Sequence, residues 1–310
     1  MLYRSLTRKK FKVSHLGLGT VNFGMDYGFN KAKTQDEADQ ILLSCRKFGI
    51  NFLDTAREYQ TSEEKIGSFL RRNPGHNFLI ATKLARIPPA STDNDKKLEE
   101  HIICSVETSL KFLGLDDLPM LQLHQTEEFL TGNEHFWKII GDLRRQKLIS
   151  AFGISVYEVE ETRLLIHEYA PLIDFIQIPY NVFDQSFEVL FPLLKEKEIG
   201  VVSRSAFLKG VITVQDADLP LELEGIKPYR KKLMELAKEF GLSQEALALL
   251  FVLGHKEIGA TIVGVNSILE LQVNVKILEQ TEQLKNFGNR LKNLAVTDPF
   301  LIDPRRWKGL

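Results

Sequence analysis

Short apolar runs alternate along the chain with longer segments of helical periodicity. Each run is four or five residues long and apolar at consecutive positions, as expected for strands of a parallel sheet that is covered on both faces. The predicted strands are 15–19, 50–53, 78–82, 120–124, 151–154, 174–178, 200–203 and 260–263.

The segments between these runs carry helix start and stop signals. Thr34 stands where an N-cap is expected, and Glu63 and Glu64 fall in the first turn of another helix, where the helix dipole favours acidic groups. Glycine follows several of the helices before the next strand, which is typical of a C-terminal stop. The predicted helices are 36–48, 62–70, 96–113, 135–145, 158–168, 187–197, 228–240, 243–253 and 267–279.

Strands that alternate with helices in this way predict an α/β fold, and eight of them favour a (β/α)8 TIM barrel. We expect a single domain over 1–310, with the barrel at about 15–280 and a C-terminal tail at about 281–310. The alternative is a doubly wound open sheet, which usually carries a G-x-G-x-x-G fingerprint after its first strand. The segment LGLGTVNFG (16–24) contains several glycines but not that fingerprint.

Composition excludes several kinds of partner. The chain has 310 residues, with 40 Lys and Arg against 41 Asp and Glu, and this balance argues against nucleic acid. The longest apolar run, 246–253, is far shorter than the ~20 residues of a membrane span, and the N-terminus lacks the apolar stretch of a signal peptide. Cys45 and Cys104 are expected to be reduced, buried thiols, which favours a cytoplasmic protein without a membrane partner.

Candidate chemistry gathers at strand ends, where barrel enzymes place their reactive groups. Asp54, Lys83 and His124 follow or end three consecutive predicted strands, and Tyr59 lies in the turn after the first of them. An Asp keeps a neighbouring Lys charged, and a charged Lys and a His beside a phenol favour the phenolate and lower the pKa of the Tyr. Such a Tyr can exchange a proton during carbonyl–alcohol interconversion. None of the four residues supplies a hydride, so the site needs a redox cofactor.

Each of these residues also has an ordinary structural explanation. Asp54 alone is a common turn or capping residue, Tyr59 a packing residue and His124 a hydrogen-bonded core histidine. The functional interpretation therefore depends on the set. Asp54 and His124 are also potential metal ligands, but the sequence has no H-E-x-x-H motif and no carboxylate–His cluster, so we expect no metal.

At these positions the sequence resembles the aldo-keto reductase family. GINFLDTAREYQTSEEKIG (49–67) is similar to the family's longest signature, which contains its catalytic Asp and Tyr. The resemblance runs from about residue 16 to about residue 274 and implies an NAD(P)H-dependent oxidoreductase that reduces a small or sugar-like aldehyde or ketone. Further segments that resemble family motifs are IATKL (80–84), LQLHQ (121–125), AFGIS (151–155) and FIQIPYN (175–181).

The resemblance implies a role for each catalytic candidate. Tyr59 would be the general acid, Lys83 would lower its pKa, and Asp54 would hold Lys83. His124 would orient the carbonyl oxygen. Phe23, Tyr59 and His124 are the residues expected in the substrate pocket.

The resemblance also implies a nicotinamide cofactor lying extended across the barrel mouth. Ser155 and Gln177 would hold the carboxamide, although Val156 stands where many members have Asn. Arg204 stands where many members have an aromatic residue against the nicotinamide, and a guanidinium plane can stack there too. The expected cofactor-binding residues are Gly19, Thr20, Asp54, Ser155, Gln177, Arg204, Ser205, Phe207, Gly210, Gly264, Asn266, Glu270 and Asn274.

The choice between NADP(H) and NAD(H) depends on the residues that would contact the adenosine end of the cofactor. The resemblance to the family favours NADP(H), whose 2′-phosphate needs charge-assisted partners. Glu270 stands where members that prefer NADPH often carry Arg, and an acid there would repel the phosphate and accept from a free ribose hydroxyl. NAD(H) therefore remains open, as does a Glu270 that simply points to solvent.

A regulatory role is the alternative function. Potassium-channel β subunits resemble this family, so the chain could be a redox-sensing module that binds NADP(H) with little turnover. We rank an enzyme acting on a small carbonyl substrate first and expect a monomer by default. Substrate selectivity is expected from 125–133, 210–227 and 294–310, the last of which contains Phe300 and Trp307 as possible pocket residues.

Overall fold

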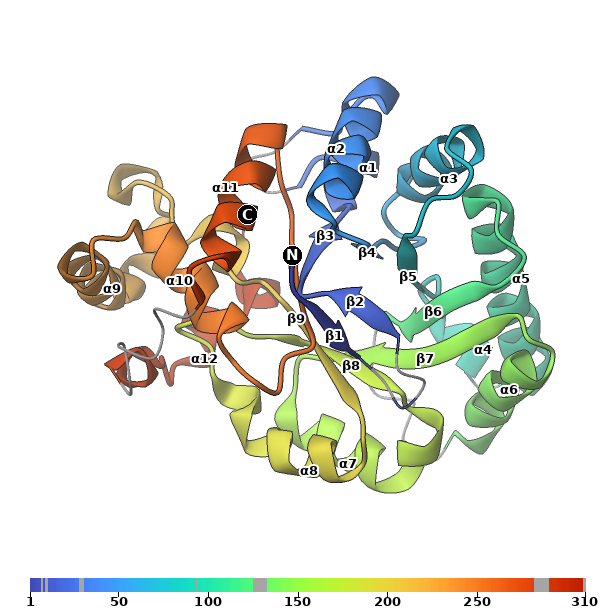
Figure 1. Cartoon of the computed structure of the whole chain (residues 1–310). Coiled ribbons are helices and arrows are strands. Elements are labelled where there is room, and N and C mark those ends of the chain that lie inside the picture. The colour runs from blue at the N-terminus through green and yellow to red at the C-terminus, as the bar shows by residue number, and fades with distance from the viewer. Residues whose placement is uncertain are drawn as a thin grey trace.

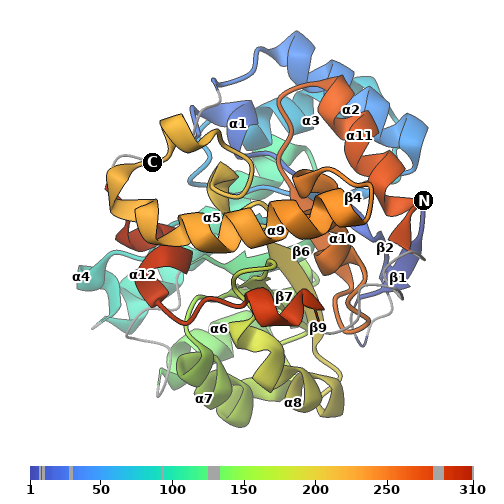
Figure 2. The same ribbon diagram turned by 90° about the vertical axis from the view of Figure 1, so that its left-hand side faces the viewer.

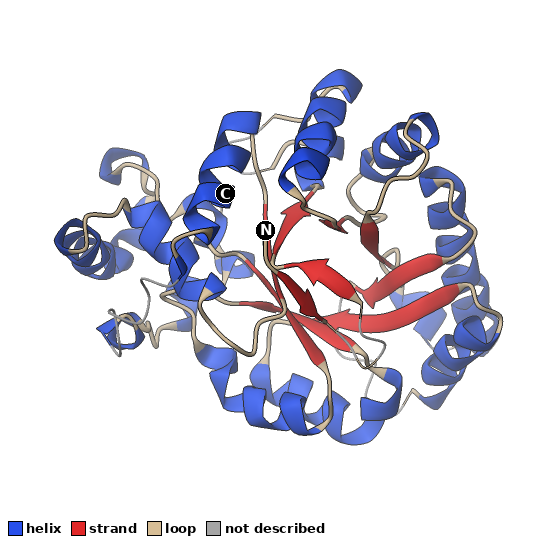
Figure 3. Cartoon of the chain, in the orientation of Figure 1, coloured by secondary structure: helices blue, strands red, loops and turns tan. Residues whose placement is uncertain are grey.

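Eight parallel strands close into a barrel, in the order β10-β3-β4-β5-β6-β7-β8-β9, in a computed structural model that describes residues 1–6, 8, 11–27, 31–92, 94–124, 133–281 and 290–308. Helices surround the strands (Figures 1 and 3), so the predicted (β/α)8 barrel is confirmed. Every predicted apolar run overlaps one barrel strand. The strands are β3 (Leu16–Gly19), β4 (Phe52–Asp54), β5 (Leu79–Lys83), β6 (Leu118–Leu123), β7 (Ile149–Ser155), β8 (Phe175–Pro179), β9 (Gly200–Arg204) and β10 (Ala260–Val263).

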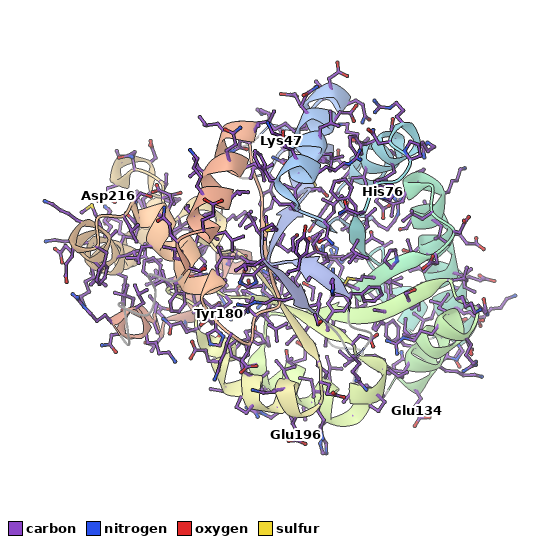
Figure 4. All side chains as sticks on the ribbon, in the orientation of Figure 1. Lys47, His76, Glu134, Tyr180, Glu196 and Asp216 are labelled. Atoms are coloured by element: carbon purple, nitrogen blue, oxygen red, sulfur yellow. The ribbon has the colours of Figure 1, made fainter. Side chains whose placement is uncertain are left out.

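The surrounding helices match the predicted segments closely. The prediction differs at 187–197, where a 3-10 turn (Ser186–Leu190) precedes a short helix, because Pro192 fits only the first turn of a helix. Side chains such as Glu134 and Glu196 point outward from this layer (Figure 4). The main helices are α2 (Gln35–Phe48), α3 (Ser62–Arg72), α5 (Asp95–Leu113), α6 (Glu134–Arg145), α7 (Val159–Tyr169), α8 (Phe191–Glu196), α9 (Lys227–Glu239), α10 (Gln244–Leu253) and α11 (Ile268–Leu278), with short helices α1 (Val21–Gly24), α4 (Pro89–Thr92) and α12 (Pro299–Ile302).

The interior of the barrel is filled by alternating large and small residues. Phe52 and Phe175 are fully buried there, together with smaller side chains from the other strands. Their rings occupy space that neighbouring glycines leave free. A Cβ atom on Gly17 would lie 2.9 Å from the Phe52 ring, and one on Gly153 would lie 2.6 Å from the Phe175 ring.

A Gly153→Ala variant is therefore expected to be less stable. Because close-packed cores accommodate an added methyl group only by strain, we expect the free energy of unfolding to fall by about 1–3 kcal/mol, measured by urea titration. Gly141→Ala on α6 is the matched control, since its Cβ would lie 3.8 Å from the nearest atom, a terminal nitrogen of Arg145. The control should be neutral or stabilised, because Ala is the better helix former. Equal losses in both variants would contradict this account of the interior.

An N-terminal hairpin closes the amino-terminal end of the barrel, and the sequence analysis did not predict it. Its strands β1 (Tyr3–Ser5) and β2 (Lys12–Ser14) pair antiparallel. Leu6 and Val13 join the apolar cluster of the barrel interior. In Figure 2 the hairpin lies at the right and α12 at the left, so the two terminal regions flank opposite ends of the barrel.

Both cysteines are free, but only Cys45 is buried, so the prediction of a buried Cys104 is wrong. Cys104 lies on the outer side of α5, where helical periodicity turns it to solvent. In the part of the chain that the structure describes, every helix is too short or too polar to cross a membrane.

Candidate active site

A cavity of about 1130 Å³ opens at the carboxyl ends of the barrel strands. It is lined by all four predicted catalytic residues, Asp54, Tyr59, Lys83 and His124. Every residue that the sequence analysis assigned to the cofactor lines it as well, from Gly19 on β3 to Asn274 on α11. Residues more than 200 positions apart in the chain are thus brought to one cavity.

Phe23 does not belong to this cavity. Its side chain is fully buried in the hydrophobic core outside the strands, because α1 turns it away from the barrel mouth. The prediction that it lines the substrate pocket is therefore wrong. The loop 125–133 was expected to influence substrate choice. Its residues 125–132 lie outside the described part of the chain.

A buried ion pair connects the strand ends to the tyrosine. The Lys83 ammonium donates to Asp54 Oδ2 at 2.8 Å and to the Thr55 carbonyl at 2.9 Å. Its third near neighbour is the Tyr59 hydroxyl at 3.4 Å. Lys83 is 1% exposed, so burial lowers the pKa of its ammonium, and the charge of Asp54 opposes that shift.

The second oxygen of Asp54 is held by two amides. Gln177 Nε2 donates to Asp54 Oδ1 at 2.7 Å and Gln122 Nε2 at 3.2 Å. Sequence reasoning missed Gln122, although it is a polar residue inside an apolar strand, two positions before His124. The strand register pairs it with Lys83, and it is fully buried. Asp54 therefore accepts hydrogen bonds from side chains of three other strands, and Gln177 has a partner that the sequence analysis did not foresee.

The pKa of Tyr59 is raised in the structure, whereas the sequence analysis predicted that it would be lowered. Burial raises the pKa of Tyr59, the Asp54 carboxylate raises it further, and Arg204 only partly opposes these effects. The net lowering of this pKa that was expected from Lys83 and His124 is therefore not found, because burial outweighs the nearby positive charges. A phenol with a raised pKa stays protonated at neutral pH, and because a general acid works best with a pKa near the working pH, it can donate that proton only where a neighbouring charge stabilises the phenolate.

His124 lies beside this phenol as a neutral imidazole. Its ring meets the Tyr59 ring edge to face, with centroids 5.9 Å apart. Burial lowers the pKa of His124 to about 3, and the charges of Lys83 and Arg204 act in the same direction. A neutral imidazole offers one N–H donor to an oxygen in the cavity.

The loop after β9 has an unusual backbone. Ser205, Leu208 and Lys209 have φ values of 61°, 47° and 55°, and Gly210 has 94°. Asn181, from the FIQIPYN segment, donates to the Ser205 carbonyl at 3.2 Å and supports the first of these positions. Strained backbone of this kind persists only where its surroundings hold it, and it is frequent in ligand-binding loops.

At the far end of the cavity, the N-terminus of α11 is capped within its own segment. Ser267 accepts from the Glu270 N–H at 3.2 Å. The Glu270 carboxylate folds back on Asn266, accepting from its backbone N–H at 2.7 Å and its side-chain amide at 3.2 Å. Glu270 thus lines the cavity and also closes the turn before α11. The sequence analysis considered a Glu270 that faces the ribose or one that points to solvent, and it did not foresee this turn contact.

These residues fit an extended dinucleotide. The cavity reaches from the Tyr59 phenol past the β9 loop to α11, and nothing lies within 4 Å of a Cβ built on Gly264. The buried oxygens Asn22 Oδ1, Gln122 Oε1 and Asn266 Oδ1 lack a hydrogen-bond partner. Buried acceptors without partners are rare in folded proteins, and two of these residues, Asn22 and Asn266, line the cavity. No group of three or more potential metal ligands occurs among the described residues.

The C-terminal tail reaches the cavity through an unexpected residue. Arg305 lines it, whereas Trp307 is 7% exposed and donates to the Phe300 carbonyl at 2.7 Å. Phe300 packs against the hydrophobic core. The expectation that Phe300 or Trp307 lines the pocket is therefore wrong. Among the described residues of the tail, Arg305 lines it instead.

The chain belongs to the aldo/keto reductase family, because the model of the Aldo/keto reductase family matches residues 15–289. The resemblance seen in the sequence is thereby confirmed. The chain is accordingly an NAD(P)-dependent oxidoreductase.

Similar proteins agree with this assignment. The chain is 28% identical to an L-galactose dehydrogenase of Arabidopsis thaliana, over 96% of this chain and 94% of the relative. It is 24% identical to a pyridoxal 4-dehydrogenase of Microbacterium luteolum, over 90% and 93% of the two chains. Among solved structures, the holo form of an aldo-keto reductase from Bacillus halodurans superimposes with a TM-score of 0.77 at 25% identity, covering 99% of this chain and 100% of that one.

Proposed function

We propose that this chain interconverts a small aldehyde or ketone and its alcohol, with Tyr59 as the proton donor for reduction. The observation that carries the proposal is the Tyr59 hydroxyl 3.4 Å from the Lys83 ammonium, in a cavity that also presents His124. The nicotinamide cofactor supplies the hydride when it is bound. Every other part of the reaction is assigned to side chains of this chain.

Each of the four residues has a different role in the proposed reaction. Tyr59 holds a proton at its hydroxyl and gives it to the developing alkoxide, and Lys83 stabilises the phenolate that remains. Asp54 keeps Lys83 in place and charged. The neutral imidazole of His124 donates to the carbonyl oxygen and orients it toward Tyr59.

The relatives suggest the kind of substrate. An L-galactose dehydrogenase, a D-threo-aldose 1-dehydrogenase and a pyridoxal 4-dehydrogenase are similar to this chain, and their names describe oxidation of aldoses or of a ring-bearing compound. Polar side chains that line the cavity, such as Asn22, Glu58 and Arg86, could hydrogen-bond substrate hydroxyls. We therefore propose a polyhydroxylated, sugar-like carbonyl compound.

A direct experiment tests the enzyme against the regulatory alternative. Nicotinamide fluorescence would be followed while NADH or NADPH is titrated into the protein, and a panel of aldoses and simple aldehydes would then be added. Turnover supports the enzyme. Binding without turnover on any of them would instead favour a redox-sensing module, since a probable potassium channel β subunit of Arabidopsis thaliana is 26% identical over 90% of this chain. No binding of either cofactor would refute both.

For the cofactor itself, we propose NAD(H), in contrast to the NADP(H) that family habit favours. The segment 262–274, which borders the adenosine end, contains no Lys or Arg, and its only charged residue is Glu270. A 2′-phosphate placed there would lack the charge-assisted partners that it needs.

A Glu270→Arg variant should reverse this preference. We expect the ratio of NADPH to NADH affinity to rise by about tenfold, the size of one charge-assisted hydrogen bond, as measured by fluorescence titration. Glu279→Arg at the exposed end of the same helix is the control for added charge. Equal ratios in the two variants would mean that Glu270 does not face the ribose.

We propose that 1–310 form one domain that works as a cytoplasmic monomer. Free Cys45 and Cys104 are consistent with a reducing compartment. Light scattering of the purified protein measures the oligomeric state.

A further inference from the structure

Three side chains from distant parts of the chain stack at the mouth of the cavity. The guanidinium carbon of Arg204, at the end of β9, lies 4.0 Å from the centre of the Tyr157 ring. The guanidinium carbon of Arg305, in the C-terminal tail, lies 4.0 Å from the centre of the same ring. The ring of Tyr157 is therefore the common cation–π partner of both arginines, and the three side chains form one stack.

Each arginine is fixed by further contacts. Arg204 donates to the Val156 carbonyl at 3.1 Å, directly before Tyr157 in the chain. Arg305 donates to Glu158 at 2.6 Å, directly after Tyr157, and to Asp303 at 2.8 Å. These two carboxylates offset the second positive charge and raise the pKa of Arg305. The stack therefore joins the β7–α7 loop, the end of β9 and the tail.

Arg204 and Tyr157 both act electrostatically on the reactive part of the cavity, Tyr157 on Tyr59 and Lys83. The charge of Arg204 acts on the pKa of Tyr59, of Lys83 and of His124, and all three line the same cavity as Arg204. Arg204 also directly precedes the strained loop that begins at Ser205. It consequently stands between the proton-donating group and the loop expected to hold the phosphates.

We propose that Tyr157 is a positioning residue: its ring holds the Arg204 guanidinium plane in place for the nicotinamide end of the cofactor. Arg204 and Tyr157 together form a platform, and Arg305 links this platform to the C-terminal tail. The proposal rests on the proposed function, because it assumes that a nicotinamide dinucleotide occupies the cavity. By thermodynamic linkage, a tail that favours cofactor binding is itself stabilised when the cofactor binds.

Cofactor affinity provides the first test. Tyr157→Leu and Arg305→Ala should each weaken NADH binding about three- to tenfold, the size of one lost cation–π contact, as measured by fluorescence titration. Tyr157→Phe keeps the ring and should stay within about twofold of the wild type. Arg306→Ala is the matched control: it removes an equal charge from the neighbouring position, whose guanidinium contacts Asp303 and not Tyr157.

Two additional measurements separate positioning from general stability. The double variant Tyr157→Leu/Arg305→Ala should bind NADH about as weakly as either single variant, because both remove one stack. Hydrogen–deuterium exchange over 299–308 should slow when NADH is added to the wild type. The same addition should change little in Tyr157→Leu.

The outcomes distinguish the platform from the proposed function. If wild-type protein binds NADH and both single variants bind it equally well, the platform is wrong while the enzyme assignment stands. If Arg306→Ala weakens binding as much as Arg305→Ala, the effect is one of charge and the stack is refuted. If the wild type binds neither nicotinamide cofactor, the proposed function fails and the platform with it.

Discussion

Replacing Tyr59 by phenylalanine is expected to lower kcat for carbonyl reduction by a factor of about 10²–10⁴, the usual contribution of a positioned general acid. The variant loses only the hydroxyl that lies 3.4 Å from Lys83, while the ring can keep its contact with His124. Affinity for the cofactor should therefore remain within about twofold. Steady-state kinetics and fluorescence titration on the same preparation measure the two effects.

A second tyrosine serves as the control for this experiment. Tyr229 packs on Phe183 outside the cavity, so Tyr229→Phe should leave kcat unchanged. If Tyr59→Phe retains more than about a tenth of the wild-type kcat, another group donates the proton. His124 would then be the next candidate, although its pKa of about 3 keeps it neutral.

Replacing Lys83 by methionine should affect both catalysis and stability. The change leaves the Asp54 carboxylate, 5% exposed, without its cationic partner, and breaking a buried ion pair in this way typically costs about 3–5 kcal/mol of stability. It also removes the charge that stabilises a Tyr59 phenolate, so kcat should fall to background. Urea unfolding and single-turnover kinetics measure the two losses.

The double variant Lys83→Met/Asp54→Asn tests the electrostatic explanation. It should recover part of the lost stability, because the carboxylate no longer lies buried without a cation, and it should remain inactive. A double variant that is less stable than Lys83→Met would show that the lost packing of the lysine chain, rather than the unpaired carboxylate, causes the destabilisation.

The barrel could be predicted because each of its strands is short, apolar on both faces and followed by a helix. The catalytic residues could be predicted for a related reason: strand ends are visible in the sequence, and parallel strands in a barrel end on the same side. The hairpin of β1 and β2 gave no such signal. Its strands have three residues each and are largely polar, and its contacts with the barrel interior come from the separated apolar residues Leu6, Phe11 and Val13.

Other features of the site depend on quantities that a sequence does not contain. The raised pKa of Tyr59 reflects burial that outweighs the nearby positive charges. The contact between Tyr157 and Arg305 joins positions that no local pattern connects. Gln122 is an intermediate case, since a glutamine inside an apolar strand indicates a buried polar partner but does not identify it as Asp54.

The paired glycines and phenylalanines inside the barrel have a consequence for changing this protein. Gly153 shares one fixed volume with Phe175, and Gly17 shares one with Phe52 and Ile262, so no member of either set can grow unless another shrinks. Each set therefore behaves as a single unit of variation. Among descendants or redesigned versions of this chain, a larger residue at 153 should be found together with a smaller one at 175.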